Sequence, residues 1–110
     1  MTTVIVAHQP ADRASLILRA GEAVVVGGRD DEWPAFMWCS CAKGEAWIPD
    51  AYMTIEANVG KMQRDYSSRE LAVASGDSVS VLERCGGWAF CNFNGEQGWI
   101  PERCLGGERT

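Results

Sequence analysis

The cysteines and the single histidine are the residues of this sequence best suited to chemistry. Cys39 and Cys41 are two residues apart, so their thiols would point the same way from a strand, and thiolates bind zinc. A structural zinc site takes four ligands, however, and the cysteine spacing of zinc knuckles is missing. His8 is the only histidine, and no catalytic motif surrounds any of the five cysteines. We therefore expect neither a metal site nor a nucleophilic Cys–His pair.

The acidic residues and the glycines give no catalytic or phosphate-binding pattern either. No pair of carboxylates stands apart from the acids that small, turn-rich domains carry on their surfaces, and no glycine-rich loop leads into a helix. The acidic run Asp30-Asp31-Glu32 before Trp33 is typical of a solvated loop tip. The alternative is a patch that contacts a basic partner, with Trp33 as its apolar anchor. We expect a protein that is not an enzyme and that uses no cofactor.

Charge and hydropathy limit which classes of partner and which cellular compartment are expected. The net charge of −5 argues against a general binder of nucleic acid, because the Lys and Arg residues are dispersed singly instead of clustered. The chain has no apolar run long enough for a transmembrane helix and no export signal at its start. We expect a cytoplasmic protein that binds no nucleic acid and no membrane, and whose thiols stay reduced without a structural disulfide.

An internal repeat organises the chain. Four segments form two pairs that align without gaps, at offsets of 55 and 52 residues respectively: residues 16–26 with 71–81, and residues 36–49 with 88–101. The first copy thus holds three extra residues, which fall in the Gly-, Asp- and Pro-containing stretch 27–34, typical of a loop. We expect two copies, at 3–56 and 60–106, joined by the short linker 57–60.

Each copy has the pattern of β structure. Val24 and Val26 alternate with small or polar neighbours, as do their counterparts in the second copy, which is typical of a strand with one buried face. Asn94-Gly95 favours a tight hairpin turn of type I′. Glycines and prolines interrupt every stretch longer than about a dozen residues, the length that a marginal helix needs. The expected fold class is all-β.

An ordered set of motifs in the second copy resembles an SH3 domain. The set comprises an Asp-Tyr ending to the first strand, a Gly-Asp pair, a strand-opening Trp, an Asn-Gly turn and a Gly-Trp-Ile-Pro ending: Met62-Gln-Arg-Asp-Tyr66, Gly76-Asp77, Gly87-Trp-Ala89, Asn94-Gly95 and Gly98-Trp-Ile-Pro101. The first copy is similar but keeps fewer features: Leu16, Leu18, Gly21-Glu22, Trp47-Ile-Pro49 and Tyr52. The chain thus resembles tandem SH3-like proteins of the bacterial variant SH3 kind. The resemblance implies two small, five-stranded SH3-like barrels in tandem.

The resemblance also implies a site and a ligand. SH3 domains hold proline-rich segments in a shallow groove, where aromatic rings pack on the extended chain and acidic loop residues pair with a basic residue of the ligand. Carried over to matching positions, the peptide-binding residues of the second copy are Tyr66, Trp88 and Pro101, with Asp65 and Glu70 as acidic partners. Those of the first copy are Trp33, Phe36, Pro49 and Tyr52.

Each groove lacks part of the family pattern. Cys104 replaces the closing Tyr of the second copy, and Pro10-Ala11 stands at the Asp-Tyr position of the first copy. Three arrangements stay open: one copy binds weakly or binds a non-standard peptide, the two faces form one composite site, or the contact between the copies covers both. The expected function is a non-catalytic protein- or peptide-binding module for extended, proline-containing segments. The alternatives are a structural or self-associating protein whose aromatic faces are buried in interfaces, and a cell-wall-binding module of the SH3b type, which would require export.

The repeat assigns structural roles to some of the cysteines. Cys39 aligns with Cys91 at a position where the SH3 pattern has a small buried residue, so both are expected in the core. Cys85 lies beside two glycines in a loop and Cys104 lies near the end of the sequence. These two are the thiols expected at the surface.

Overall fold

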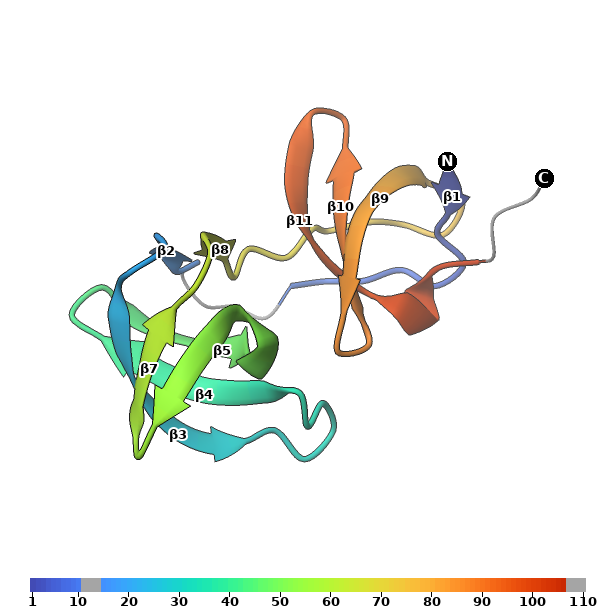
Figure 1. Ribbon diagram of the computed structural model, residues 1–110. Helices are drawn as coiled ribbons and strands as arrows, with labels where there is room; N and C mark the ends of the chain where they lie inside the picture. Colours follow the sequence, from blue (N-terminus) through green and yellow to red (C-terminus); the bar gives the residue numbers. More distant parts are fainter. Residues whose placement is uncertain (11–14, 107–110) are drawn as a thin grey trace. The chain divides into compact units, whose positions relative to one another are not determined.

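The structure, a computed structural model, describes residues 1–10 and 15–106 (Figure 1). Within that part of the chain, the regular elements are β-strands and two single-turn 3-10 helices. The strands are β1 (Thr2–Thr3), β2 (Ile17–Leu18), β3 (Ala23–Arg29), β4 (Phe36–Cys41), β5 (Gly44–Pro49), β6 (Met53–Glu56), β7 (Val59–Met62), β8 (Tyr66–Ser67), β9 (Ser78–Cys85), β10 (Trp88–Phe93) and β11 (Glu96–Pro101). The 3-10 helices η1 (Asp50–Tyr52) and η2 (Glu102–Cys104) each follow the proline that ends a strand. The all-β fold class is confirmed.

The chain divides into two compact units that alternate along the sequence. Unit 1 comprises residues 1–13 together with 69–110, and unit 2 comprises residues 14–68. This division differs from the expected copies at 3–56 and 60–106, because the first strand of each copy pairs with the body of the other. β1 pairs with β9 in unit 1, and β7 pairs with β3 in unit 2.

Unit 2 contains a five-stranded antiparallel sheet and a separate two-stranded ladder. The order in the sheet is β5-β4-β3-β7-β6. The ladder consists of β2 and β8, which lie side by side in Figure 1. The alternation of apolar residues decides which side of β3 is buried: Val24 and Val26 face the core, whereas Val25 between them is exposed. Strand β3 therefore has one buried side and one exposed side, as the alternation in the first copy predicts.

The segment expected as a linker, residues 57–60, belongs to unit 2. Glu56 of β6 pairs with Val59 of β7, so the two residues between them form a tight hairpin turn. Gly60 is buried in β7, where a Cβ would lie 2.7 Å from Met53 Sδ. Residues 57 and 58 are thus a turn, as the sequence suggests, whereas Val59 and Gly60 belong to β7, where the close approach of the strands requires a glycine.

Unit 1 is built on a four-stranded antiparallel sheet in the order β1-β9-β10-β11. Its core comes from both chain segments of the unit: Val4, Leu71, Val73, Val79, Ala89, Cys91, Ile100 and Cys104. Isolated bridges from Val4 to Leu105 and from His8 to Val73 extend the contact between the two segments. The first ten residues are therefore an integral part of the C-terminal unit.

None of the sheets in the described residues closes into the expected five-stranded barrel. In unit 1 the outer edge of β11 meets the chain at residues 69–71: the Trp99 N–H donates to Arg69 O at 2.8 Å, and the Leu71 N–H donates to Trp99 O at 3.1 Å. A single bridge, between Glu70 and Trp99, stands here in place of a continuous ladder. The sheet stays open because this contact is too short to form a strand pair.

Local predictions about turns and cysteines have mixed outcomes. Asn94 and Gly95 have φ values of 52° and 83°, which confirms the left-handed hairpin turn. Cys39 and Cys91 are fully buried, as expected. The surface position expected for Cys104 is wrong, because η2 turns this residue into the core of unit 1.

Candidate functional site

In unit 1, two half-buried rings meet a carboxylate at the start of β10. The rings of His8 and Trp88 pack edge to face, with centroids 5.6 Å apart and planes at 83°. His8 Nε2 lies 2.8 Å from Glu70 Oε1, in a hydrogen bond that the imidazole donates to the carboxylate. We call these three residues the unit 1 face. The face joins an aromatic surface directly to an acidic group.

Backbone pairing fixes each member of the unit 1 face. His8 and Val73 exchange two N–H to O hydrogen bonds, of 2.9 and 3.1 Å. Glu70 is held by its bridge to β11. Trp88 follows two glycines with positive φ and pairs across the ladder with Pro101. The three side chains therefore start from ordered backbone on three different parts of unit 1.

Solvent has partial access to the unit 1 face. The side chains of His8 and Glu70 are 16% and 24% exposed, and Trp88 is half-buried. The face can offer apolar contact area, one carboxylate and one imidazole to a ligand. Among residues 1–10 and 15–106, no three His, Cys, Asp or Glu side chains gather as metal ligands.

The matching positions of unit 2 hold a packed aromatic cluster. The rings of Tyr52 and Tyr66 meet edge to face at 5.3 Å, and Phe36 pairs with Pro49 across the β4–β5 ladder. All four residues are buried, with Tyr52 and Tyr66 only 4% and 5% exposed. We call these four residues the unit 2 face. Their burial makes them part of the core of unit 2.

Two further contacts hold the rings of the unit 2 face in place. The Tyr66 hydroxyl donates a hydrogen bond to Trp47 O at 2.8 Å. The guanidinium carbon of Arg64 lies 4.2 Å from the centre of the Tyr52 ring, in cation–π geometry. A side chain of the same unit thus occupies the ring surface that a ligand would need.

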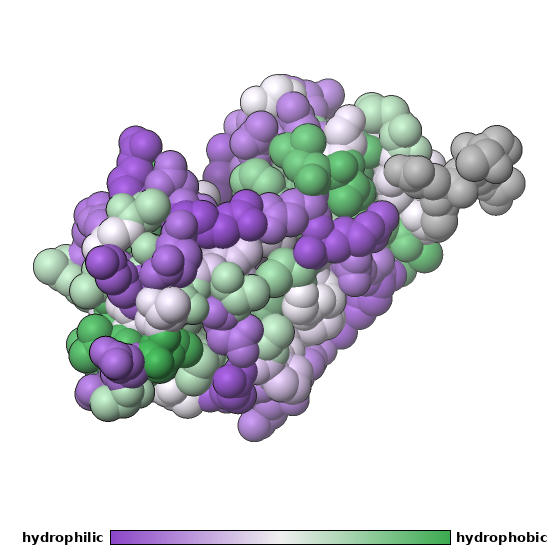
Figure 2. All heavy atoms as spheres, in the orientation of Figure 1, coloured by the Kyte–Doolittle hydropathy of each residue, from purple (hydrophilic) through white to green (hydrophobic). Residues whose placement is uncertain are grey.

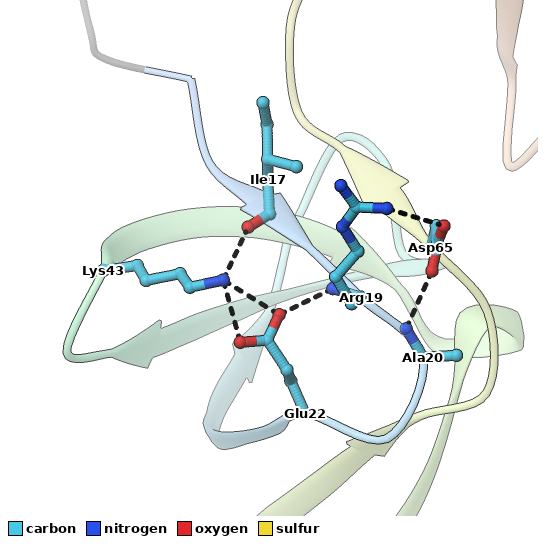
Figure 3. Close-up of polar contacts among 6 residues, drawn as sticks. All are labelled: Ile17, Arg19, Ala20, Glu22, Lys43 and Asp65. Carbon is cyan, nitrogen blue, oxygen red and sulfur yellow. Dashed lines mark hydrogen bonds and ion pairs between the residues drawn. The ribbon is translucent and has the colours of Figure 1, made fainter.

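Asp65, predicted as an acidic partner for a ligand, stabilises a turn in unit 2 (Figure 3). One oxygen accepts a hydrogen bond from the Ala20 N–H at 2.9 Å, and the other lies 3.7 Å from Arg19. Lys43, which lies between β4 and β5, comes within 2.8 Å of Glu22 in this turn, and Glu22 also accepts the Arg19 N–H. The hydrogen bond from Lys43, and then that from the Arg19 backbone, lower the pKa of Glu22 below its usual value. Asp65 and Glu22 thus form their hydrogen bonds and ion pairs with residues of unit 2.

Trp33 lies half-buried in the loop between β3 and β4. Its carbonyl accepts the Phe36 N–H at 2.9 Å. Asp30 Oδ1 accepts the N–H of Glu32 at 2.9 Å and that of Trp33 at 3.4 Å. The acidic run thus folds into a local turn that positions Trp33. Its contact with a basic partner stays a prediction.

The structure regroups the predicted site residues. The sequence groups Tyr66 and Asp65 with Trp88, Glu70 and Pro101, but the first two lie in unit 2 and the other three in unit 1. Tyr66 therefore joins the aromatic residues of the first copy. In unit 1, the residue that packs against the Trp88 indole is His8 and not Tyr66.

Sequence reasoning missed His8 as a member of the unit 1 face. His8 pairs with Val73 in unit 1, and Tyr66 pairs with Leu18 in unit 2. Because Leu18 and Val73 are aligned in the repeat, His8 and Tyr66 occupy equivalent positions. His8, and not Pro10-Ala11, thus occupies the position for which the resemblance predicts a tyrosine, and Ala11 lies outside the described residues. Counting back from Tyr66 by the 55-residue offset of the repeat gives position 11 and not His8, so the repeat alone could not locate this residue.

The two aligned thiols are chemically quiet. Burial raises the pKa of Cys39 and of Cys91 to about 11, with a small further contribution to Cys39 from Cys41. Neither side chain is a thiolate near neutral pH, and a thiolate is the reactive form. Both therefore act as small apolar core residues.

Apolar surface outside the two faces is scattered. Figure 2 shows apolar side chains in separate patches on the side drawn, among mostly polar atoms. The exposed apolar residues include Val25 and Val59, which pair across β3 and β7. In the described part of the chain, no helix has the length and apolar character needed to cross a membrane. Comparisons with protein-family models, curated proteins and solved structures found no match.

Proposed function

We propose that this chain is a non-catalytic, cytoplasmic binding module of two SH3-like units, and that the unit 1 face holds an extended, proline-containing segment of a partner protein. One observation carries the proposal: the half-buried Trp88 indole packs against His8, whose imidazole is hydrogen-bonded to Glu70. Aromatic surface next to a carboxylate is the combination that an extended basic peptide needs.

The chemistry of such a ligand follows from the face. A proline-containing segment is already extended when free, so it loses little conformational entropy on binding. The flat indole of Trp88 supplies apolar contact area without demanding hydrogen bonds. A Lys or Arg of the ligand would pair with Glu70 and take the place of His8 as its partner. The net charge of −5 also attracts a basic segment.

A peptide titration followed by NMR tests the proposal. Proline-rich peptides with one basic residue should shift the Trp88 indole N–H signal, and matched peptides with Gln in place of the basic residue should bind about 10-fold more weakly. Trp88→Ala should abolish the binding. Trp38→Ala is the control, because Trp38 is half-buried in unit 2, next to Trp47. A library that leaves the Trp88 signal unmoved would exclude the unit 1 face as the site.

Unit 2 supports a second role, that of a structural element. The observation that favours it is the burial of Tyr52 and Tyr66 with Arg64 over the Tyr52 ring. Arg64→Ala should therefore lower the stability of unit 2 and leave the affinity for the peptide unchanged. A large change in affinity with unchanged stability would assign the ligand to unit 2 instead.

A further inference from the structure

Residues 1–10 and 59–68, here called the closing segments, make the same backbone contacts in the two units. Three pairs of hydrogen bonds correspond: Val4 N to Asp77 O with Met62 N to Glu22 O, Gly76 N to Val4 O with Gly21 N to Met62 O, and Ile5 N to Cys104 O with Gln63 N to Tyr52 O. All six are 2.7 or 2.8 Å long. The contacted residues of the two bodies are 55 or 52 residues apart, as in the repeat, whereas the closing-segment residues are 58 apart. The closing segments therefore occupy equivalent slots in the same register.

Each closing segment comes from the sequence copy that it does not complete. Residues 1–10 begin the first copy and pair with the body of the second, within unit 1. Residues 59–68 begin the second copy and pair with the body of the first, within unit 2. In this connectivity each half of the chain lacks its own first strand and uses that of the other half.

We propose that the two sequence copies are reciprocal strand-exchange partners: the half 1–57 and the half 58–110 bind each other by each donating its closing segment, whether or not a peptide bond joins them. The interaction surface on each half is the slot along β9 or β3. The partner that fits each slot is the closing segment of the other half. Main-chain hydrogen bonds supply the affinity, as in other cases of strand addition.

Side-chain packing makes the two slots selective. A Cβ on Gly60 would lie 2.7 Å from Met53 Sδ and 2.9 Å from Val26 Cγ2. Thr2 stands at the equivalent place in unit 1, where it is buried opposite Val79. Residues 1–10 would thus clash in the slot of unit 2, because their threonine meets the space that only a glycine fits. The slot of unit 2 therefore directs the first closing segment to the second copy.

The join between the halves lies outside both cores. Ala57 and Asn58 are exposed, and they connect the paired residues Glu56 and Val59. Ala57 has a φ of 52°, a left-handed conformation that an alanine adopts only at a cost. Asn58 O accepts a hydrogen bond from the Val26 N–H at 2.7 Å, and a cut between Ala57 and Asn58 leaves this bond as a contact between the halves. The cut also releases the strain at Ala57. The join can therefore be cut without loss of the contacts that hold the halves together.

The exchange also builds the unit 1 face from both halves. His8 comes from the first half, and Glu70 and Trp88 come from the second. Strand exchange does not depend on the peptide-binding role, since it concerns only how the chain completes its two units. The tests below contain no peptide, so they can fail or succeed independently of that role.

The first test cuts the folded full-length chain at the join. A protease recognition sequence inserted between Ala57 and Asn58 is cleaved after folding, and the product is examined by gel filtration and mass spectrometry without denaturant. The two halves are expected to elute together as one folded particle of the intact mass. Halves that separate in native buffer would overturn the proposal, because copies that close themselves need no partner.

The second test uses intact chains with paired cysteines, in a background where Cys41 and Cys85 are changed to serine. Thr3→Cys with Ser78→Cys should form a disulfide, since Thr3 and Ser78 are cross-strand partners in unit 1. Thr3→Cys with Ala23→Cys is the matched control, because Ala23 aligns with Ser78 in the repeat. A disulfide in the control and none in the first pair would show that each copy closes itself, and would overturn the proposal.

A pair of glycine variants tests the selectivity in the cleaved chain. Gly60→Thr should make the halves dissociate at least 10-fold more readily, because the threonine clashes in the slot of unit 2. Gly28→Thr is the control, because Gly28 lies on β3 at a place where a Cβ would meet no atom within 4 Å. Equal behaviour of the two variants would refute the role of Gly60.

Discussion

The unit 1 face and the unit 2 face share two equivalent positions, His8 with Tyr66 and Trp88 with Phe36, yet the first face is partly exposed and the second is buried. His8 in unit 1 contacts a half-buried indole and shares a hydrogen bond with a carboxylate. Tyr66, at the equivalent position in unit 2, is buried against Tyr52 and hydrogen-bonded to a backbone carbonyl. The same backbone position therefore supports a polar, reachable surface in one unit and an aromatic core in the other.

The difference lies in the side chains that surround the shared position. In unit 2, Tyr52 packs against Tyr66, and the guanidinium of Arg64 lies over the Tyr52 ring. In unit 1 the residue aligned with Tyr52 is Cys104, which is too small to reach across and packs inward. A few substitutions between the two copies thus decide whether the side chains at this position are packed into the core or partly exposed.

The largest predicted effect separates the two faces by stability. Tyr66→Ala should lower the free energy of unfolding by about 3–5 kcal/mol, because it removes a buried ring. His8→Ala, at the equivalent position, should lower it by only about 1 kcal/mol, because that side chain is partly solvated and loses one hydrogen bond. Urea unfolding of both variants measures the contrast. Equal losses would mean that the unit 1 face is packed as tightly as the unit 2 face.

The sequence predicted the features that depend on local pattern. Alternation around Val24 predicted a strand with one buried side, and Asn94-Gly95 predicted a turn with positive φ. The alignment of Cys39 with Cys91 predicted two core thiols. Each of these features follows from residues close in the sequence or from matched positions in the repeat.

The exchange of the closing segments could not be predicted in the same way. A repeat shows which segments are alike, but not which of two equivalent bodies a segment pairs with. Residues 1–10 and 59–68 share few residue types, so their equivalence becomes visible only in the register of their hydrogen bonds. Gly60 is the residue that makes the slot of unit 2 selective, but in the sequence it resembles a linker glycine. Only the structure shows that Met53 and Val26, on the neighbouring strands, leave no room for a side chain there.

Thr2 and Gly60 occupy equivalent positions in the two slots, opposite Val79 and Val24. The Thr2 hydroxyl is buried and has no hydrogen-bond partner among the described residues. Thr2→Val should therefore raise the free energy of unfolding by about 1 kcal/mol, because valine has the same shape without the unsatisfied oxygen. Urea unfolding measures the change, and Thr3→Val, at an exposed neighbour, serves as the control. A destabilised Thr2→Val protein would show that the hydroxyl has a partner in solution.

The smallest predicted effect concerns the turns that precede β3 and β9. Glu22 and Asp77 accept equivalent backbone hydrogen bonds, from the N–H groups of Arg19 and Ala74. Only Glu22 has a lysine partner, Lys43, and this hydrogen bond is the main reason why its pKa is lowered from 4.5. The two turns are thus matched in backbone bonding but differ in one ion pair.

A lowered pKa in the folded state fixes the sign of the pH effect. The folded protein binds the proton less readily than the unfolded chain, so the contribution of Glu22 to stability is complete above about pH 4.5 and is lost as the pH falls through the lowered pKa. Lys43→Met should reduce this acid-dependent loss, measured by urea unfolding across the acidic range at low and high salt. Lys61→Met, at another exposed lysine of unit 2, is the control. Both lysines are exposed, and the pairing with Glu22 distinguishes Lys43 from Lys61. Identical pH profiles for the two variants would therefore show that the ion pair does not stabilise this turn.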